Sequence, residues 1–332
     1  MLFKWFSSLD KFVPALLLVI LLASIFPEPA AYQGSFTLHT VGDIGITLIF
    51  LFYGLKLNPK KLRQDLSNWR LHMVVQAATF IIFPLIVLPF YNFYSFHSNE
   101  LLWMGAFFLA TLPSTVSSSV VMVSIAGGNV PGAIFNASIS SLAGIVITPL
   151  WMSLVLTSVQ ATTPESAAYS SILIKLILQV LLPVITGIVL NRFLGSWAQA
   201  HLRFLKLFDQ SVILLIVYLS FGQSFYLNLF AQTEWTDILV IMLLCSSLFF
   251  TVFLIIHLIS KKLKFNRGDR ITALFAGSKK SLIHGTVMAG ILFKGFTGIG
   301  VILLPLMIYH ALQLVYSGII AQHFSKQLPP AP

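Results

Sequence analysis

The sequence predicts an all-α polytopic membrane protein with ten transmembrane helices. Of its 332 residues, 57% are hydrophobic and 9% are charged, with a mean hydropathy of +0.91. Because a soluble globular domain carries about 25% charged residues, this composition excludes that class. The apolar runs are continuous and do not alternate with a two-residue period, which favours helices over strands.

Ten apolar segments have about the length, roughly 20 residues, that a helix needs to cross a bilayer. They cover residues 12–27, 42–57, 72–91, 101–125, 131–157, 170–190, 210–228, 238–259, 271–293 and 299–321. We treat residues 1–332 as a single membrane domain that ends in a short cytoplasmic tail at 322–332. The sequence contains no P-loop, dinucleotide fingerprint or cysteine–histidine cluster, so we expect no cofactor, no metal and no nucleic-acid partner.

The distribution of lysine and arginine predicts the orientation of these helices. Sixteen of the twenty basic residues lie in the N-terminal stretch, in alternate loops or in the tail. The remaining loops, at 28–41, 92–100, 158–169 and 229–237, contain none. Because short loops rich in lysine and arginine stay in the cytoplasm, we expect both termini on the cytoplasmic side of a plasma (inner) membrane.

The ten segments divide into two halves, 12–157 and 170–321, whose basic loops correspond after a shift of five segments. An odd shift inverts one half relative to the other, which is a common construction among secondary transporters. The first segment also has an alternative interpretation, a cleaved signal peptide, because a basic start and an apolar run precede Pro27–Ala31. The repeat favours retention of this segment.

The equivalent helices of the two halves, the fourth and the ninth, carry the most polar interruptions of any apolar run. These are Leu112-Pro-Ser-Thr-Val-Ser-Ser-Ser119 and Gly277-Ser-Lys-Lys-Ser281. Non-helical backbone at membrane depth must be buried in protein or line a cavity, so we expect both helices to be discontinuous and their breaks to touch. The candidate substrate or ion-site residues are Ser114, Thr115, Ser117, Ser118, Ser119, Ser278, Lys279, Lys280, Ser281 and His284.

The two adjacent lysines are the least expected residues of this set, because a lysine at the bilayer centre costs roughly 2.5–3.5 kcal/mol on insertion scales. Lys280 lies nine residues after Ile271, about 14 Å along a helix, which disfavours snorkelling to the membrane surface. Simple close packing of helices is the alternative explanation for the serines. Burial disfavours the charged form of a lysine, so coupling to protons stays open, with His284 on the same helix face as Lys280.

The order of motifs across nearly the whole chain resembles the bile acid:sodium symporter family. The similar stretches are Gly54–Leu57, Ala78–Pro84, Pro113 with its polar run, Gly128–Val130 and Thr148-Pro149. Gly277–Leu282 is most similar to a divergent branch of uncharacterised bacterial members and one outlying vertebrate member. The resemblance implies inverted repeats arranged as core and panel domains, with helices four and nine unwound and crossed in the core. It also implies sodium behind the crossing and an organic anion in front of it.

The sodium site implied by the resemblance lacks its charged ligand here. Sodium-coordinating members have an acidic residue and a glutamine in helix nine, and these positions match Phe275 and Lys279. A lysine at this position brings a positive charge of its own. We therefore hypothesise that Lys279, Lys280 or both replace the bound sodium.

The other implied sodium ligands are also only partly retained. The polar pair of helix four matches Ser118 and Ser119, and the glutamine of helix three matches Thr79. The hydroxyl ligands of helix five match Ala133 and Ala137, with Asn136 adjacent to the second. Thr79 and Asn136 therefore join the candidate residues.

These observations predict a secondary transporter-like protein for an organic anion, with sodium coupling doubtful and proton coupling open. One alternative is a non-transporting membrane regulator or ligand sensor that is built on the transporter fold. Another is an intramembrane enzyme with a serine nucleophile and a lysine base. The sequence has no nucleophile elbow and no second acid near these serines, so we do not expect an enzyme.

Overall fold

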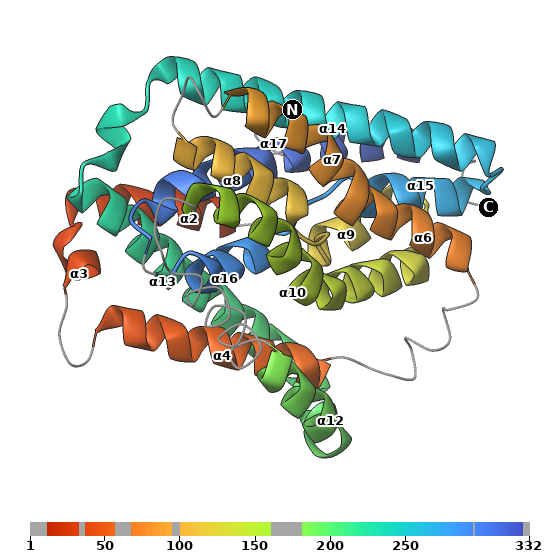
Figure 1. The fold of residues 1–332 in the computed structure, drawn as a ribbon. Coiled ribbons are helices and arrows are strands. Elements are labelled where there is room, and N and C mark those ends of the chain that lie inside the picture. Colours follow the sequence, from red (N-terminus) through yellow and green to blue (C-terminus); the bar gives the residue numbers. More distant parts are fainter. Residues whose placement is uncertain are drawn as a thin grey trace. The chain divides into compact units, whose positions relative to one another are not determined.

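The computed structural model of the chain describes residues 12–32, 37–56, 68–94, 100–160, 181–294 and 296–327. Within these ranges the regular elements are all helices (Figure 1). Six of the described helices are long and apolar enough to cross a membrane. The expectation of an all-helical, multi-pass membrane protein is thus confirmed, whereas the count of ten spans stays a prediction. Residues 170–180 of the sixth predicted segment lie outside the described ranges.

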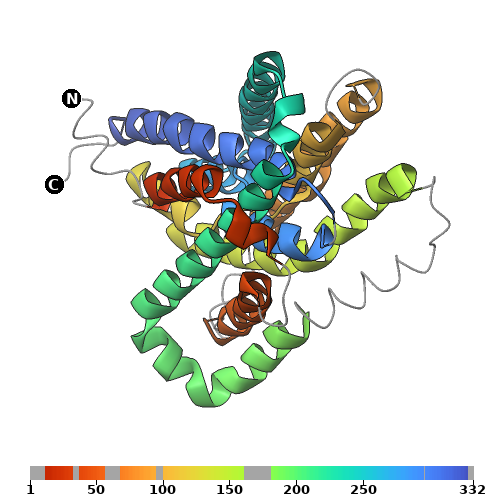
Figure 2. The same cartoon turned by 90° about the vertical axis from the view of Figure 1, so that its left-hand side faces the viewer.

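The chain forms two compact units, of which the first contains Met1–Lys56, Ile174–Gln232 and Thr286–Val301. Its described elements are α2 (Phe12–Ile25), α3 (Glu28–Ala31), α4 (Leu38–Lys56), α12 (Leu182–Ala200), α13 (Leu202–Tyr226), the 3-10 turn η4 (Leu229–Gln232) and most of α16 (Leu282–Leu292). Figure 2 shows α12 and α13, in green, diverging from their junction like the arms of a V. Only His201 separates these two helices, so most of the loop expected at 191–209 is helical.

Two glycines bring the backbones of α4 and α12 into contact. A Cβ atom on Gly54 would lie 2.3 Å from the Val184 carbonyl oxygen, and one on Gly187 would lie 2.2 Å from the Leu51 carbonyl oxygen. Small residues at such crossings allow the close van der Waals contact on which helix association in membranes depends. The ion pair between Lys56 Nζ and Asp209 Oδ2, at 2.7 Å, ties α13 to the end of α4.

The second unit contains Leu57–Leu173, Thr233–Gly285 and Ile302–Pro332. Its described elements are α6 (Trp69–Ala77), the π-helical turn η2 (Ala78–Ile82), α7 (Phe83–Tyr94), α8 (Glu100–Thr111), α9 (Ser117–Ile125), α10 (Val130–Gln160), α14 (Trp235–Lys262), α15 (Arg267–Gly277) and most of α17 (Ile299–Ser325). Both polar stretches of the sequence are breaks in helices. Residues 112–116 separate α8 from α9, and residues 278–281 separate α15 from α16.

We predict that Gly54→Ala destabilises the protein and that Gly42→Ala does not. Both glycines lie in α4, but a Cβ atom on Gly42 would make only an ordinary contact with Leu219, at 3.5 Å. Overpacking at Gly54 should cost about 1–3 kcal/mol, whereas alanine at Gly42 should gain up to about 1 kcal/mol of helix propensity. Thermal unfolding in detergent measures both effects, and equal melting temperatures for the two variants would contradict the close contact.

Candidate functional site

Lys280 is completely buried, and its ammonium group lies at the C-terminal end of α8. Nζ donates hydrogen bonds to the carbonyl oxygens of Thr79 (2.7 Å), Ala110 (2.7 Å) and Leu112 (2.8 Å). It also lies 4.1 Å from the centroid of the Phe83 ring. The last carbonyl groups of a helix have no intrahelical donors and form its negative end. The positive charge is therefore compensated by backbone dipoles and an aromatic face.

Thr79 contributes its backbone to this arrangement, and its hydroxyl has another partner. The Thr79 hydroxyl donates to the Val75 carbonyl at 2.8 Å, within its own helix. Its carbonyl belongs to the π-helical turn η2, where the spacing of backbone hydrogen bonds departs from that of an α-helix. This turn directs the Thr79 carbonyl to Lys280.

Lys279 is also completely buried, but its ammonium group has a different partner. Nζ donates to the Ser118 carbonyl at 2.9 Å and lies 5.9 Å from the centroid of the Phe275 ring. Residues 278–281 are not helical, so each of the two adjacent side chains extends to a different part of the fourth segment. The ion pairs formed among the described residues involve neither lysine.

Serine side chains between α8 and α9 or at the start of α9 in turn donate hydrogen bonds to carbonyl groups at the C-terminal end of α15. The Ser114 hydroxyl donates to the Ala276 carbonyl at 2.5 Å, and the Ser119 hydroxyl donates to the Phe275 carbonyl at 3.2 Å. The backbone N–H of Ser281 donates to the Pro113 carbonyl at 2.8 Å. The two helix breaks are thus hydrogen-bonded to each other in both directions.

Two residues of α17, which the sequence analysis missed, hold the break between α15 and α16. Gln313 donates from Nε2 to the Lys280 carbonyl and accepts from the Lys280 N–H at Oε1, both at 2.9 Å. The Tyr309 hydroxyl donates to the Ser278 carbonyl at 2.7 Å. A glutamine in the middle of an otherwise apolar segment was the available signal, because a buried amide needs polar partners.

The remaining candidates belong to the site to different degrees. The Thr115 hydroxyl contacts the hydroxyls of Ser118 and Ser119, at 2.7 and 3.0 Å. Within the break between α15 and α16, Ser278 Oγ donates to the Leu274 carbonyl and Ser281 Oγ lies 2.9 Å from His284 Nδ1.

Two candidates lie outside this network. Ser117 is exposed. Asn136, on α10, donates to the Gly132 carbonyl and receives hydrogen bonds from Gln76. These hydrogen bonds of Asn136 stay within α6 and α10 and do not reach the joined breaks.

Two of the positions matched to sodium ligands have apolar surroundings. Phe275 and Ala133 are fully buried in one apolar cluster that also contains Val123 and Ile271. Neither side chain supplies an oxygen, and the described residues contain no group of three histidine, cysteine, aspartate or glutamate side chains that could hold a metal ion.

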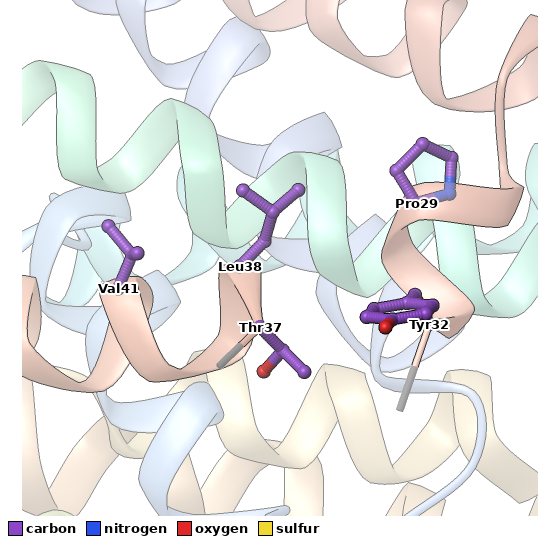
Figure 3. A pocket seen from close by; sticks show the side chains of 5 residues that line it. All are labelled: Pro29, Tyr32, Thr37, Leu38 and Val41. Atoms are coloured by element: carbon purple, nitrogen blue, oxygen red, sulfur yellow. The ribbon is translucent and has the colours of Figure 1, made fainter. Parts of the chain in front are cut away.

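A pocket occurs elsewhere, in the first unit (Figure 3). It is lined by Pro29, Tyr32, Thr37, Leu38 and Val41. None of the candidate residues lines it, so we base no functional site on it.

We predict that Lys280→Met prevents stable folding, whereas Lys279→Met is tolerated better. The first variant leaves three buried carbonyl groups without their donor, and each unsatisfied group costs about 1–3 kcal/mol. The sum approaches the total stability of a typical domain, about 5–15 kcal/mol. Lys279→Met removes one such hydrogen bond. Monodispersity and melting temperature in detergent measure the difference, and a Lys280→Met protein as stable as wild type would contradict this role.

Comparisons with known proteins identify the family to which this chain belongs. The model of the SBF-like CPA transporter family matches residues 10–326. An uncharacterized protein of Pseudomonas aeruginosa is 36% identical over 96% of this chain and 93% of its own length. "Putative symporter YfeH" of Escherichia coli is 34% identical over 98% and 95%. Sodium/bile acid cotransporter 7 of Xenopus tropicalis is 30% identical over 94% and 90%. These relatives indicate a transporter rather than an enzyme, and the chain belongs to the SBF-like CPA transporter family.

Proposed function

We propose that this protein carries an organic anion across the membrane without coupling to sodium. The observation that carries the proposal is the completely buried Lys279, whose ammonium group lies 2.9 Å from the Ser118 carbonyl oxygen and 5.9 Å from the centroid of the Phe275 ring. At this position an ammonium group takes the place of a coupling cation, because it supplies the same charge to the same kind of oxygen ligand. Protons or a counter-anion would then drive transport.

The electrostatic argument against sodium depends on distance. At about 4 Å and an effective dielectric constant of about 20, two unit positive charges repel by about 4 kcal/mol, close to a thousandfold in affinity. Phe275 provides no carboxylate to offset this repulsion. The hydroxyls of Ser118 and Ser119 are neutral, and each already contacts the Thr115 hydroxyl.

The proposal includes the architecture that alternating access requires. It takes the ten helices as two inverted repeats, 12–157 and 170–321, with α8–α9 and α15–α16 as the crossed, discontinuous pair. It takes the second compact unit as the core and the first as the panel. Both termini lie on the cytoplasmic side of the inner membrane.

A second candidate function is a membrane regulator or ligand sensor that transports nothing. The observation that favours it is that the lysine ammonium groups already have protein partners on the described residues. Such a site can act as a fixed structural joint. Counterflow of a labelled organic anion in proteoliposomes separates the two functions, because a regulator produces no counterflow.

We predict that sodium does not stabilise the purified protein. A cation that binds the folded state raises the melting temperature in proportion to the logarithm of its concentration. Replacing choline with sodium at constant ionic strength should therefore leave the melting temperature unchanged. A rise that is specific to sodium and grows with the logarithm of its concentration would contradict the proposal, without any need to know the substrate.

We further predict that Lys279→Gln combined with Phe275→Glu creates sodium-dependent stabilisation. The double variant removes the resident positive charge and adds the missing carboxylate at the matched position. Lys261→Gln serves as the control, because it removes a positive charge from an exposed position at the end of α14. The double variant should show a rise in melting temperature with sodium over choline. Absence of this rise in a folded double variant would count against the assignment of Lys279 to the cation position.

The predicted orientation is tested with single cysteines at Thr236 and Lys264 in a Cys245→Ala background. Both positions are exposed, at opposite ends of α14. A membrane-impermeant thiol reagent added to intact cells should label Thr236→Cys alone. Labelling of Lys264→Cys from outside would reverse the topology.

A further inference from the structure

The turn between α14 and α15 is the most basic stretch of the described chain. Ten consecutive residues contain Lys261, Lys262, Lys264, Arg267 and Arg270. Their one acidic neighbour in this stretch, Asp269, accepts hydrogen bonds from the neutral amides of Asn129 and Asn266, both at 2.8 Å. The ion pairs formed among the described residues include none of the five basic side chains. The turn therefore keeps a concentrated positive charge.

The C-terminal end of α17 extends this charge. Arg267 Nη2 donates to the Phe324 carbonyl at 2.9 Å, which places the end of α17 beside the turn. Lys326 comes directly after the last residue of α17 and is exposed. We call the combined set the basic surface; it consists of Lys261, Lys262, Lys264, Arg267, Arg270 and Lys326.

Lys264 has a backbone conformation in which glycine is the usual residue at the end of a helix. Its φ is 55°, in the left-handed region. The Phe265 N–H donates to the Ser260 carbonyl and the Lys264 N–H donates to the Lys261 carbonyl, the hydrogen-bond pattern of a Schellman motif. L-residues with a Cβ atom are strained there. A lysine at a position suited to glycine indicates a role for its charge rather than for its backbone.

The basic surface lies where lipid headgroups are expected. At about 1.5 Å per residue, the 28 residues of α14 span about 42 Å, more than a hydrocarbon core of about 30 Å. Only 28% of the apolar window of α14 is buried within the protein. Beside the basic residues, Leu258 and Leu263 are 55% and 40% exposed. The basic groups thus adjoin exposed apolar side chains at one end of a helix that is long enough to cross a membrane.

We propose that the basic surface binds an anionic phospholipid, with the lysine ammonium groups and arginine guanidinium groups on the lipid phosphate. Guanidinium groups offer paired donors to phosphate oxygens, and juxtamembrane lysines attract anionic headgroups. Leu258 and Leu263 contact the acyl chains of the same lipid. A free phosphate ion offers the same charge without these chains.

Binding of a fluorescent phosphatidylglycerol to the detergent-purified protein tests the proposal. The triple variant Lys261→Gln/Lys262→Gln/Lys264→Gln should bind it about fivefold more weakly for each lysine removed. Phosphatidylcholine and inorganic phosphate should compete poorly with phosphatidylglycerol. Equal competition by inorganic phosphate would overturn the proposal, because the site would then recognise the anion alone.

The matched control is Arg192→Gln/Arg203→Gln/Lys206→Gln, which removes three positive charges from exposed positions on α12 and α13. It should leave phosphatidylglycerol binding close to that of wild type. An equal loss in both triple variants would overturn the proposal, because binding would then follow net charge alone.

Lys264→Gly separates the lipid role from a structural role. It relieves the left-handed strain, so it should raise the melting temperature in lipid-free detergent. It should also weaken phosphatidylglycerol binding by about fivefold. Unchanged lipid binding in this variant would contradict the role assigned to Lys264, even if the triple variant fails to fold.

Discussion

The hydrogen bonds from Lys280 to three backbone carbonyls are the interaction on which the arrangement of the second unit depends. Backbone polar groups inside a membrane have no water to bind, so every break in a helix must find partners within the protein. Lys280 supplies three donors from one atom, at the point where α8 ends and where η2 departs from α-helical spacing. Without such a donor, a break between α8 and α9 at this depth would leave its carbonyls unpaired.

The carbonyl groups along the break show how complete this compensation is. Each of the six consecutive carbonyl oxygens from Phe108 to Pro113 accepts a hydrogen bond. Those of Phe108, Leu109 and Thr111 accept from Thr111 Oγ1, Leu112 N and Thr148 Oγ1, respectively. Those of Ala110 and Leu112 accept from Lys280 Nζ, and that of Pro113 accepts from Ser281 N. Half of these six hydrogen bonds have their donor in the ninth segment. The break of the fourth segment is therefore stable only when the ninth segment is in place, and the reverse holds for α15 and the serines.

A lysine differs from a bound ion because it cannot leave. A hydrogen bond to a charged group contributes about 1.5–3 kcal/mol, so three of them can offset a desolvation penalty of several kcal/mol. With three carbonyl partners, the side chain of Lys280 is thus a permanent part of the joined breaks. Lys279, with a single carbonyl partner, is the less constrained of the two lysines. This difference is the reason to assign structure chiefly to Lys280 and the cation position to Lys279.

The sequence by itself determined the helical membrane class, the position of both helix breaks and the family. Composition and uninterrupted apolar length are local properties, and a polar stretch such as Gly277–Ser281 can exist at membrane depth only as a break with buried partners. Only the tertiary structure decided which hydrogen-bond donor pairs with which acceptor. Gln313 and Tyr309 join the site, Thr79 uses its carbonyl, and Lys279 and Lys280 diverge, because these contacts link residues 31 to 201 positions apart. In a non-helical segment, the direction of each side chain follows from the local backbone geometry. No periodicity in the sequence describes that geometry.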